Sequence, residues 1–356
     1  MRQILFQIPL NRDWDLGPLG TWPGFGFGLL LGIWAIVSVF MIRREWKAQK
    51  QFNNEVVSAI VYSVVVSALI VLLPRFVTKA ELDVYGYGMM LVVAVFASGK
   101  VASTMGKKIG VDPQFTWDLT VKLILAGVVG ARLFYLIQYH ERVFKDCRGL
   151  GDMFAAAVRL PDGGLVLYGG LIFAALTGVW MCYRNNIPRI KYVDALVPAV
   201  FVGIACGRIG CFLNGCCYGD PCELPWAVTF PQGSVPWSAL AGQGFIAKTA
   251  TESLSLHPTQ IYSSLNALIL AWLTASYYKH RSGDGAVIAL GLMTYSISRT
   301  CIEILRGDEL GQFGTGFTIS QWISFGVFLL GAAFFWWSWT QSKTRLTSDV
   351  PDVSAT

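Results

Sequence analysis

Four polar residues stand four, four and three positions apart in an apolar part of the chain: Tyr295, Arg299, Glu303 and Arg306. Because an α-helix has 3.6 residues per turn, this spacing places them on one helix face. Glu303 can pair with Arg299, but two arginines share this one acid, so the face keeps surplus positive charge. Planar guanidinium groups bind phosphate oxygens well. The stripe therefore predicts an anion site, with phosphate as the best-suited ligand, or else a purely structural ion-pair set.

A glycine-rich segment carries another arginine. Residues Gly207–Gly219 read Gly-Arg-Ile-Gly-Cys-Phe-Leu-Asn-Gly-Cys-Cys-Tyr-Gly, with Arg208 near the start. The first glycines permit close backbone approach, and the last two loosen the helix at its end. Irregular polar backbone in apolar surroundings is tolerated where it lines a cavity. We therefore predict that Arg208 lines a cavity, with glycine-mediated helix packing as the alternative.

The cysteines allow several interpretations. Eight are present: Cys147, Cys182, Cys206, Cys211, Cys216, Cys217, Cys222 and Cys301. The five from Cys206 to Cys222 fall within 17 residues. Zinc and iron–sulfur sites usually show C-x-x-C pairs, and this sequence has none, so no metal site is predicted. A disulfide among Cys216, Cys217 and Cys222, or a thiol nucleophile at Cys211 or Cys216, stays open. Buried, apolar cysteine is the leading interpretation.

Of the three histidines, His257 is the candidate for chemistry. It opens an apolar stretch in the sequence His-Pro-Thr-Gln-Ile-Tyr. Imidazole can carry a proton near neutral pH. A simple helix-end role is the equal alternative, because Pro258 suits the first turn of a helix. His280 stands among basic residues and is interpreted as part of a solvated loop.

The composition shows which elements must position these residues. The 356 residues are 54% hydrophobic and only 14% charged, with a mean hydropathy of +0.51, whereas a soluble domain is typically ~25% charged. A helix needs ~20 apolar residues to cross a bilayer. Long apolar stretches predict nine membrane-spanning helices, at about 24–42, 56–74, 85–105, 118–138, 164–183, 193–213, 259–278, 285–305 and 319–340. These stretches are apolar on all sides, which favours helices over barrel strands.

Further ionisable residues fall inside or at the edges of these spans. They include Lys122, Arg132 and Asp194. A charge at mid-bilayer costs at least ~2.5 kcal/mol, so such residues normally face the bundle interior. Lys122 lies near a span end, where its side chain can reach the membrane surface. For Asp194, at a helix start, capping or pairing and a functional role are equally compatible with the sequence.

The distribution of basic residues predicts the orientation. Loops 43–50, 106–117, 184–192 and 279–284 and the tail 341–356 each hold at least two Lys or Arg, whereas loop 214–258 holds one. Short cytoplasmic loops are enriched in these residues. We therefore expect a periplasmic amino terminus and a cytoplasmic carboxy terminus. The net charge of +6 is this topology signal, and nucleic acid is not expected as a partner. Residues 1–23 lack the pattern of a cleavable signal peptide.

Taken together, these segments resemble the bacterial prolipoprotein diacylglyceryl transferases. The resemblance runs from about residue 85 to 335, roughly 70% of the chain. It rests on motifs in a fixed order: Tyr87-Gly88, Gly130–Tyr135, Tyr168–Leu171, Asp194 with Pro198, Gly207–Gly219, His257–Tyr262, and Arg299 through Arg306. Each motif alone is weak, but the ordered set is specific.

The resemblance implies an all-α polytopic membrane protein. Its seven-helix core would lie in the bacterial cytoplasmic (inner) membrane, with a small periplasmic head formed by loop 214–258. Residues 1–80 would add two amino-terminal transmembrane helices to a core at 81–342, and 343–356 would form a cytoplasmic tail. Two extra helices leave the orientation of the core unchanged, in agreement with the charge distribution.

The reaction implied is transfer of a diacylglyceryl group from phosphatidylglycerol to the lipobox cysteine of a prolipoprotein, with release of glycerol 1-phosphate. No cofactor or metal would be needed, and the protein would act as a monomer among membrane lipids. Fixed arginines would stabilise the charge that develops on the leaving phosphate. We expect catalytic roles for Arg299, Glu303, Tyr87 and Tyr168, and substrate-binding roles for Arg208, Asn214, Gly219, Tyr295, Arg132 and His257.

The chain departs from the family pattern at three positions. Tyr168 stands where members carry histidine before Gly-Gly, and Cys211 and Cys216 stand where they carry asparagine and glutamate. Tyrosine, with a pKa of ~10, is a poor base, but its hydroxyl can position a phosphate or a thiol. The cysteine-containing form of the glycine segment resembles one branch of the family.

Two other functions stay open at this point. One is a related membrane enzyme with another lipid or acceptor. The other is a non-enzymatic protein, either an anion transporter or a redox sensor built on the cysteines. A transporter would more often show repeated halves and paired broken helices, neither of which is visible in the sequence.

Overall fold

The structure is a computed structural model. It describes residues 4–9, 14–15, 21–22, 25–49, 56–57, 60–64, 66–68, 81–145, 149–158, 164–306 and 314–348. The chain divides into two compact units, Arg2–Gly88 and Met89–Thr356. Cys147, part of the predicted span 56–74 and the last eight residues of the predicted tail lie outside the described residues.

The amino-terminal unit combines short strands with apolar helix. Strand β1 (Ile4–Pro9) pairs antiparallel with β4 (Glu81–Tyr85), and β2 (Trp14–Asp15) pairs with β3 (Thr21–Trp22). Helix α1 (Phe25–Gln49) follows, and residues 56–57, 60–64 and 66–68 are also helical. Trp34 of α1 donates from Nε1 to the carbonyl oxygen of Ser63 at 3.2 Å, so the two helical segments lie together.

The strands of this unit were not predicted from the sequence. Gln7 of β1 donates to the carboxylate of Asp83 on β4 across 76 positions of chain. A pairing of such separation has no local turn signal, which is why the hydropathy pattern shows the helices and misses the strands.

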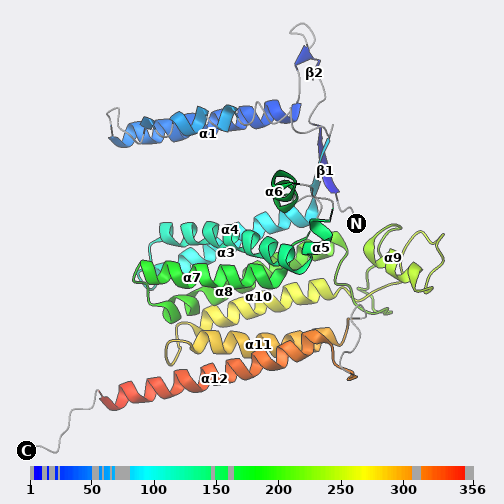
Figure 1. The fold of residues 1–356 in the computed structure, drawn as a ribbon. Helices are drawn as coiled ribbons and strands as arrows, with labels where there is room; N and C mark the ends of the chain where they lie inside the picture. The colour runs from blue at the N-terminus through cyan, green and yellow to red at the C-terminus, as the bar shows by residue number, and fades with distance from the viewer. Residues whose placement is uncertain are drawn as a thin grey trace, which may run out of the picture. The chain divides into compact units, whose positions relative to one another are not determined.

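Apolar helices form the larger unit, and they lie side by side in Figure 1. They are α3 (Gly86–Lys107, whose first residues belong to the other unit), α4 (Pro113–Gln138), α7 (Leu167–Arg184), α8 (Arg189–Asn214), α10 (Thr259–Tyr277), α11 (Ala286–Glu303) and α12 (Ile319–Ser348). By length and composition, α3, α4, α8 and residues Ile319–Gln341 of α12 can each cross a membrane. Every predicted span from residue 85 onward coincides with one of these helices, which confirms the all-α polytopic membrane fold.

Helices α4 and α7 meet through glycines. A Cβ added to Gly130 would lie 2.5 Å from the carbonyl oxygen of Gly169, and one added to Gly169 would lie 2.4 Å from the carbonyl oxygen of Gly130. The two backbones therefore touch, as small residues allow between membrane helices. Two short helices, α5 (His140–Val143) and α6 (Leu150–Val158), follow α4.

Asp194 fixes the start of α11. Its side chain is fully buried, and its two carboxylate oxygens accept hydrogen bonds from the backbone N–H groups of Gly285 at 2.7 Å and Ile288 at 2.9 Å. An acidic side chain at a helix amino terminus satisfies unpaired N–H groups and favours the helix dipole. Asp194 therefore has a capping role, but it caps α11 rather than its own helix, which begins at Arg189 and not near Asp194 as the sequence predicted.

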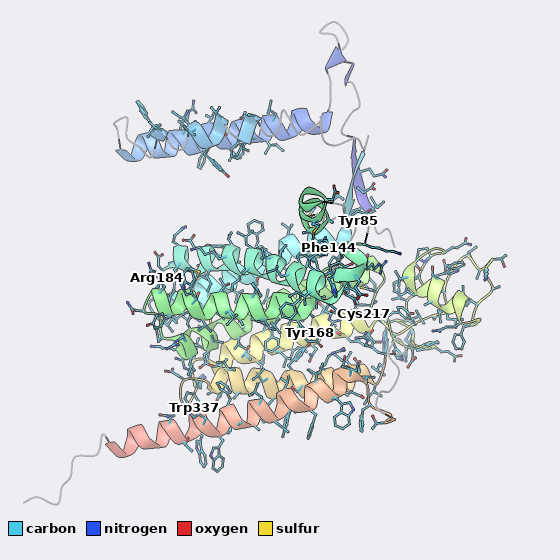
Figure 2. All side chains as sticks on the ribbon, in the orientation of Figure 1. Tyr85, Phe144, Tyr168, Arg184, Cys217 and Trp337 are labelled. Atoms are coloured by element: carbon cyan, nitrogen blue, oxygen red, sulfur yellow. The ribbon has the colours of Figure 1, made fainter. Side chains whose placement is uncertain are left out.

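Residues 215–258 form a small head beyond the ends of α8 and α10 (Figure 1). It contains α9 (Val235–Gly242) and isolated bridges that pair Leu256 with Pro221 and Val228. Phe230, Leu240 and Leu256 form its buried core. Cys217, where the head begins, and Arg184, at the end of α7, lie at opposite ends of the helix bundle (Figure 2).

Candidate functional site

The predicted stripe on α11 converges on one buried carboxylate. Glu303 has a fully buried side chain, and its Oε2 lies 2.6 Å from Nη1 of Arg299 and 3.6 Å from Nη1 of Arg306. Helix α11 ends at Glu303 rather than continuing through Arg306. A turn, in which the N–H of Arg306 donates to the carbonyl of Glu303 at 3.0 Å, keeps Arg306 within reach. One acid therefore holds two arginines, as the spacing predicts.

The first residues of α12 and those just before it close the other side of this group. Thr318 donates from its hydroxyl to Oε1 of Glu303 at 3.1 Å, and Arg299 donates from Nη2 to the hydroxyl of Ser320 at 3.0 Å. Both oxygens of Glu303 thus have partners, which suits this side chain to orienting the arginines. Nη1 of Arg299 is buried, and its partner among the described residues is Oε2 of Glu303, in an ion pair rather than an aligned hydrogen bond.

Arg208 and Tyr295 belong to the same electrostatic neighbourhood. Arg299 interacts electrostatically with Glu303, Arg306, Arg208 and Tyr295. Arg208 comes from α8, so the glycine-rich segment and the α11 stripe meet in space, which the sequence did not specify. Three arginines around one carboxylate leave surplus positive charge in a buried site. Such a site favours a bound anion.

Gly219 lies where three segments meet. A Cβ at this position would lie 2.6 Å from Cβ of His257 and 2.6 Å from the carbonyl oxygen of Leu305. Its N–H donates to the carbonyl of His257, and the N–H of Asp220 donates to that of Leu305, both at 3.0 Å. Only glycine fits this close approach, so Gly219 fixes the loop after α8 against the start of α10 and the end of α11.

His257 faces a hydrogen-bonded pair from the head and α10. Its Nδ1 lies 3.4 Å from the hydroxyl of Tyr262, which accepts a hydrogen bond from Nε1 of Trp226 at 2.7 Å. His257 also lies against Gly219 through their backbones. The structure therefore places His257 beside Gly219, where the head, the loop after α8 and the segment after α11 meet.

A largely apolar groove adjoins the arginine group. It is a cavity of about 610 Å³ between α11 and α12, and we call it the α11–α12 groove; it is lined by Ser296, Ile297, Thr300, Cys301, Phe317, Gln321, Trp322, Ser324, Phe325 and Phe328. Ser296 and Thr300 flank Arg299 on α11, and Gln321 follows Ser320 on α12. A charged pocket and an apolar groove therefore share two helices, an arrangement that suits a ligand with an anionic head and hydrocarbon chains.

Comparison with known proteins identifies the family to which this chain belongs. Residues 74–337 match the family model of the prolipoprotein diacylglyceryl transferases. A phosphatidylglycerol–prolipoprotein diacylglyceryl transferase of Clostridium tetani is 31% identical over 250 residues, covering 70% of this chain and 91% of the relative. One of Rhodopirellula baltica is 28% identical over 434 aligned positions, covering 91% of this chain and 86% of the relative. The chain belongs to the prolipoprotein diacylglyceryl transferase family.

Not every residue expected from the transferase resemblance joins the arginine group. Arg132 on α4 is buried and donates to three backbone carbonyls: from Nε to Ala157 at 2.9 Å, from Nη1 to Gly164 at 3.1 Å and from Nη2 to Ala156 at 3.0 Å. These contacts tie α4 to α6 and to the segment before α7. The described contacts of Arg299 and Glu303 do not include Arg132.

The three other expected residues lie at helix ends. Tyr168 is in the first turn of α7 with 60% of its surface exposed. Tyr87 is in the first turn of α3 and belongs to the amino-terminal unit. Asn214 is the last residue of α8, followed by Gly215 in the left-handed conformation (φ 79°). That conformation ends the helix where the glycine-rich segment predicts a break.

Sequence reasoning missed the contribution of α12 to this transferase site. Thr318 and Gln321 form a reciprocal cap, in which the N–H of Thr318 donates to Oε1 of Gln321 at 3.0 Å and the N–H of Gln321 to the hydroxyl of Thr318 at 3.3 Å. The pattern Thr-x-x-Gln is a recognisable helix-start signal. It could have located the start of α12, but not its approach to Glu303.

The cysteines of the glycine segment form no disulfide, and three of them are close together. Among the described residues, seven cysteines have free thiols, so the disulfide considered from the sequence is not present: Cys182, Cys206, Cys211, Cys216, Cys217, Cys222 and Cys301. The sulfur atoms of Cys211, Cys216 and Cys217 all lie within 4.8 Å of one another. The adjacent thiols of Cys211 and Cys217 can donate to the sulfur of Cys216, which lowers the pKa of the Cys216 thiol.

Proposed function

We propose that this protein transfers the diacylglyceryl group of phosphatidylglycerol to the lipobox cysteine of prolipoproteins and releases glycerol 1-phosphate. Membership of the transferase family supports this, and so do the relatives named for that reaction. The observation that carries the proposal is the buried group of Arg208, Arg299 and Arg306 around Glu303, next to an apolar groove.

The arginine group is suited to the phosphate of the lipid. Arg208 binds the headgroup phosphate, and Arg299 stabilises the charge that grows on the phosphate as the glyceryl carbon–oxygen bond breaks. Glu303 and Ser320 hold the guanidinium of Arg299 in place, so that its planar fork is already oriented for the phosphate. Fixed donors in a site shielded from water are worth far more than in solution, because they need no reorganisation.

The α11–α12 groove is suited to the acyl chains. Its exposed walls are almost entirely apolar, with aromatic side chains from the segment before α12 and from α12 itself. A phospholipid seated here would place its phosphate at the arginines and its chains between the two helices. This match of an amphiphilic ligand to an amphiphilic site favours phosphatidylglycerol over a small soluble anion.

The acceptor thiol would approach from the side of the head. Its sulfur attacks the glyceryl carbon, a C–S bond forms, the C–O bond to phosphate breaks, and the electron pair leaves with glycerol 1-phosphate. His257, which lies beside Gly219 on the side of the head, is our candidate to accept the thiol proton. We retain Tyr87 and Tyr168 as candidate catalytic residues, and Asn214, Gly219, Tyr295 and Arg132 as candidate substrate-site residues. For Arg132, the contacts support a positioning role rather than direct binding.

We further propose that the protein acts as a monomer in the bacterial inner membrane with its head in the periplasm. In this arrangement residues 1–80 are an amino-terminal extension, 81–342 the transferase core and 343–356 a cytoplasmic tail. The basic residues in the loops at the end opposite the head support this orientation. Reporter fusions after residues 48 and 345 should both give cytoplasmic signals, and a periplasmic signal from either would reverse the proposed orientation.

The function is tested by complementation and by purified enzyme. The gene should restore lipidation of a labelled prolipoprotein in a bacterium depleted of its own transferase. Purified protein should transfer diacylglyceryl from phosphatidylglycerol to a lipobox peptide. If Arg208→Ala and Arg299→Ala both fold, as judged by thermal melts, and both keep near-full transfer rates, the phosphate-clamp mechanism is wrong.

A further inference from the structure

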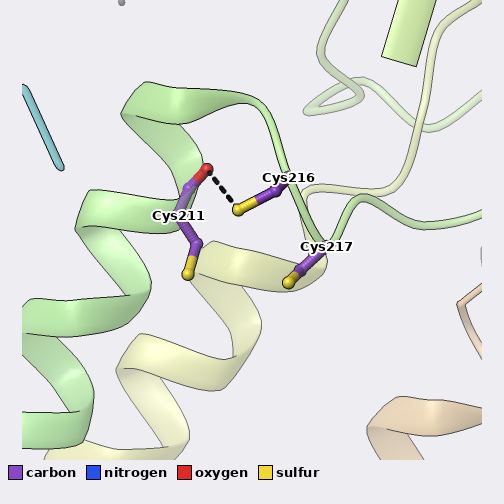
Figure 3. Close-up of side chains that lie close together, drawn as sticks. All are labelled: Cys211, Cys216 and Cys217. Carbon is purple, nitrogen blue, oxygen red and sulfur yellow. Dashed lines mark hydrogen bonds between the residues drawn. The ribbon is translucent and has the colours of Figure 1, made fainter. Parts of the chain in front are cut away.

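Three thiols converge where α8 ends and the head begins. Cys211 lies in the last turn of α8, and Cys216 and Cys217 follow the helix after Gly215 (Figure 3). Their sulfur atoms all lie within 4.8 Å of one another, and all three residues are partly buried. The proposed transferase mechanism uses none of these thiols, so their convergence needs a separate explanation.

The backbone creates this convergence at a conformational cost. Adjacent side chains on an extended chain point in opposite directions. Cys217, however, has a left-handed backbone (φ 60°) that non-glycine residues rarely adopt. This conformation turns its side chain toward those of Cys216 and Cys211. Such backbone conformations persist where surrounding contacts enforce them, and they cluster at functional sites.

Helix α10 enforces this conformation from the other side. The hydroxyl of Thr259 donates to the carbonyl of Cys217, and Nε2 of Gln260 donates to the carbonyl of Cys216, both at 2.8 Å. Gln260 is fully buried, and its Oε1 has no hydrogen-bond partner among the described residues. A buried acceptor without a partner, on a side chain that binds the backbone of Cys216, indicates that a proton-bearing ligand is missing from this place.

We propose that Cys211, Cys216 and Cys217 form a three-thiolate site for Zn²⁺ with one coordination position open. A tetrahedral site with Zn–S bonds of ~2.3 Å has its sulfur atoms about 3.8 Å apart. The present separations therefore need to close by no more than about an ångström. Soft thiolate ligands select zinc over magnesium or calcium. Arg208 precedes Cys211 by three positions on the same helix face, and its charge offsets the negative charge of a three-thiolate zinc centre.

The open position suggests what the metal does, and this step rests on the proposed function. The lipobox thiol would bind as the fourth ligand and lose its proton, which passes through water to His257, with Oε1 of Gln260 as a hydrogen-bond acceptor. The resulting thiolate then attacks the glyceryl carbon, the C–S bond forms, and the C–O bond breaks with its electron pair going to the departing phosphate. Metal binding would supply a thiolate without the histidine that Tyr168 replaces.

From the sequence we predicted no metal site, because it contains no C-x-x-C pair. That rule describes ligands carried on a short turn. Here one ligand lies on a helix and two lie beyond a left-handed break, so spacing along the chain carries no signal. The proposal thus departs from the sequence prediction on the strength of the convergence in space.

Metal binding is tested on the full-length protein in detergent, reduced and stripped of metal, by titration with Co²⁺ alone. We expect about one equivalent to bind, with a thiolate-to-cobalt charge-transfer band, and Zn²⁺ to displace it. Cys217→Ser should weaken binding at least tenfold. Cys222→Ser is the matched control, because Cys222 lies in the same loop but outside the cluster; it should bind cobalt as the unaltered protein does. Thermal melts verify that both variants fold.

The result that overturns the site is the absence of the band, or equal binding by Cys217→Ser. A disulfide among the three cysteines in protein purified without reductant, with no bound zinc, would also overturn it. The fourth-ligand role is tested by adding a lipobox peptide and its Cys→Ser counterpart. Only the cysteine peptide should change the cobalt spectrum, and identical spectra would overturn this role. Because the titration needs no turnover, its failure is distinguishable from failure of the transferase assay.

Discussion

Two buried arginines in the helix bundle have opposite surroundings. Arg132, on α4, donates to three backbone carbonyls, and its guanidinium also lies 5.3 Å from the ring centroid of Tyr135. Arg299, on α11, shares one carboxylate with Arg306 and lies in the field of Arg208. Both side chains are costly to bury, and both belong to motifs of the transferase family.

The difference lies in what the donors already bind. Carbonyl oxygens satisfy the Arg132 guanidinium from three directions, so this residue joins segments of the chain. Arg299 is held by one carboxylate, which it shares with Arg306, and by one hydroxyl, and its site has more positive than negative charge. Burial and motif membership therefore do not distinguish a structural arginine from a ligand-binding one. The partners of the guanidinium do, and the following predictions test that distinction.

The largest effect is expected at Arg299. Arg299→Ala should lower the transfer rate ~1000-fold, about 4 kcal/mol of transition-state stabilisation, with little change in melting temperature. Arg299→Lys should restore little activity, because an ammonium group lacks the planar fork. The measurement is diacylglyceryl transfer by purified variants. Full rescue by lysine would mean that a point charge is sufficient and that the fork geometry is irrelevant.

Arg132→Ala should show the opposite pattern. Loss of charged donors to buried carbonyls should lower the free energy of unfolding by about 3 kcal/mol. Each folded molecule should still transfer at a rate within about tenfold of the unaltered protein. A residue that acts through packing mainly changes how much of the enzyme is folded, not how fast the folded enzyme works. Thermal melts and transfer rates per folded molecule measure the two effects. A stable Arg132→Ala protein without activity would place Arg132 among the substrate ligands.

Gly219→Ala tests whether the arginine group needs its surrounding framework. The added methyl group would meet His257 and Leu305 at 2.6 Å, which forces the end of α11 away from the loop. A displacement of about 1 Å near the reacting groups can lower the rate ~100-fold. Gly203→Ala is the matched control, because its Cβ would meet Ser98 at an ordinary 3.7 Å. Equal activity of the two variants would show that the junction tolerates movement.

The smallest effect is expected at Glu303. Glu303→Gln keeps the shape and the acceptor for Thr318 but removes the charge that orients both arginines. The rate should fall about tenfold, because an orienting group contributes less than the residue it orients. Kinetics at several phosphatidylglycerol concentrations should show the loss mainly in kcat. A loss as large as that of Arg299→Ala would indicate that Glu303 itself takes part in proton transfer.

The sequence predicts the parts of this molecule that depend on local pattern. The spans follow from hydropathy, and the α11 stripe from helical periodicity, because both are properties of neighbouring residues. The contact of Thr318 with Glu303, the carbonyl partners of Arg132 and the pairing of β1 with β4 depend on how distant segments meet. No spacing rule encodes them. The cysteine cluster is the clearest case, since its three ligands come together through one left-handed residue.

The α11–α12 groove also bears on how the enzyme would exchange material with its surroundings. Several of its lining side chains face outward from the protein, with Phe317, Trp322 and Phe325 each about half exposed. A substrate with two acyl chains, and a product that keeps them, can therefore enter and leave sideways within the bilayer. Turnover would then depend on two-dimensional diffusion and on the fluidity of the lipid, so chilling a membrane below its chain-melting transition should slow the enzyme more steeply than the chemical barrier alone requires.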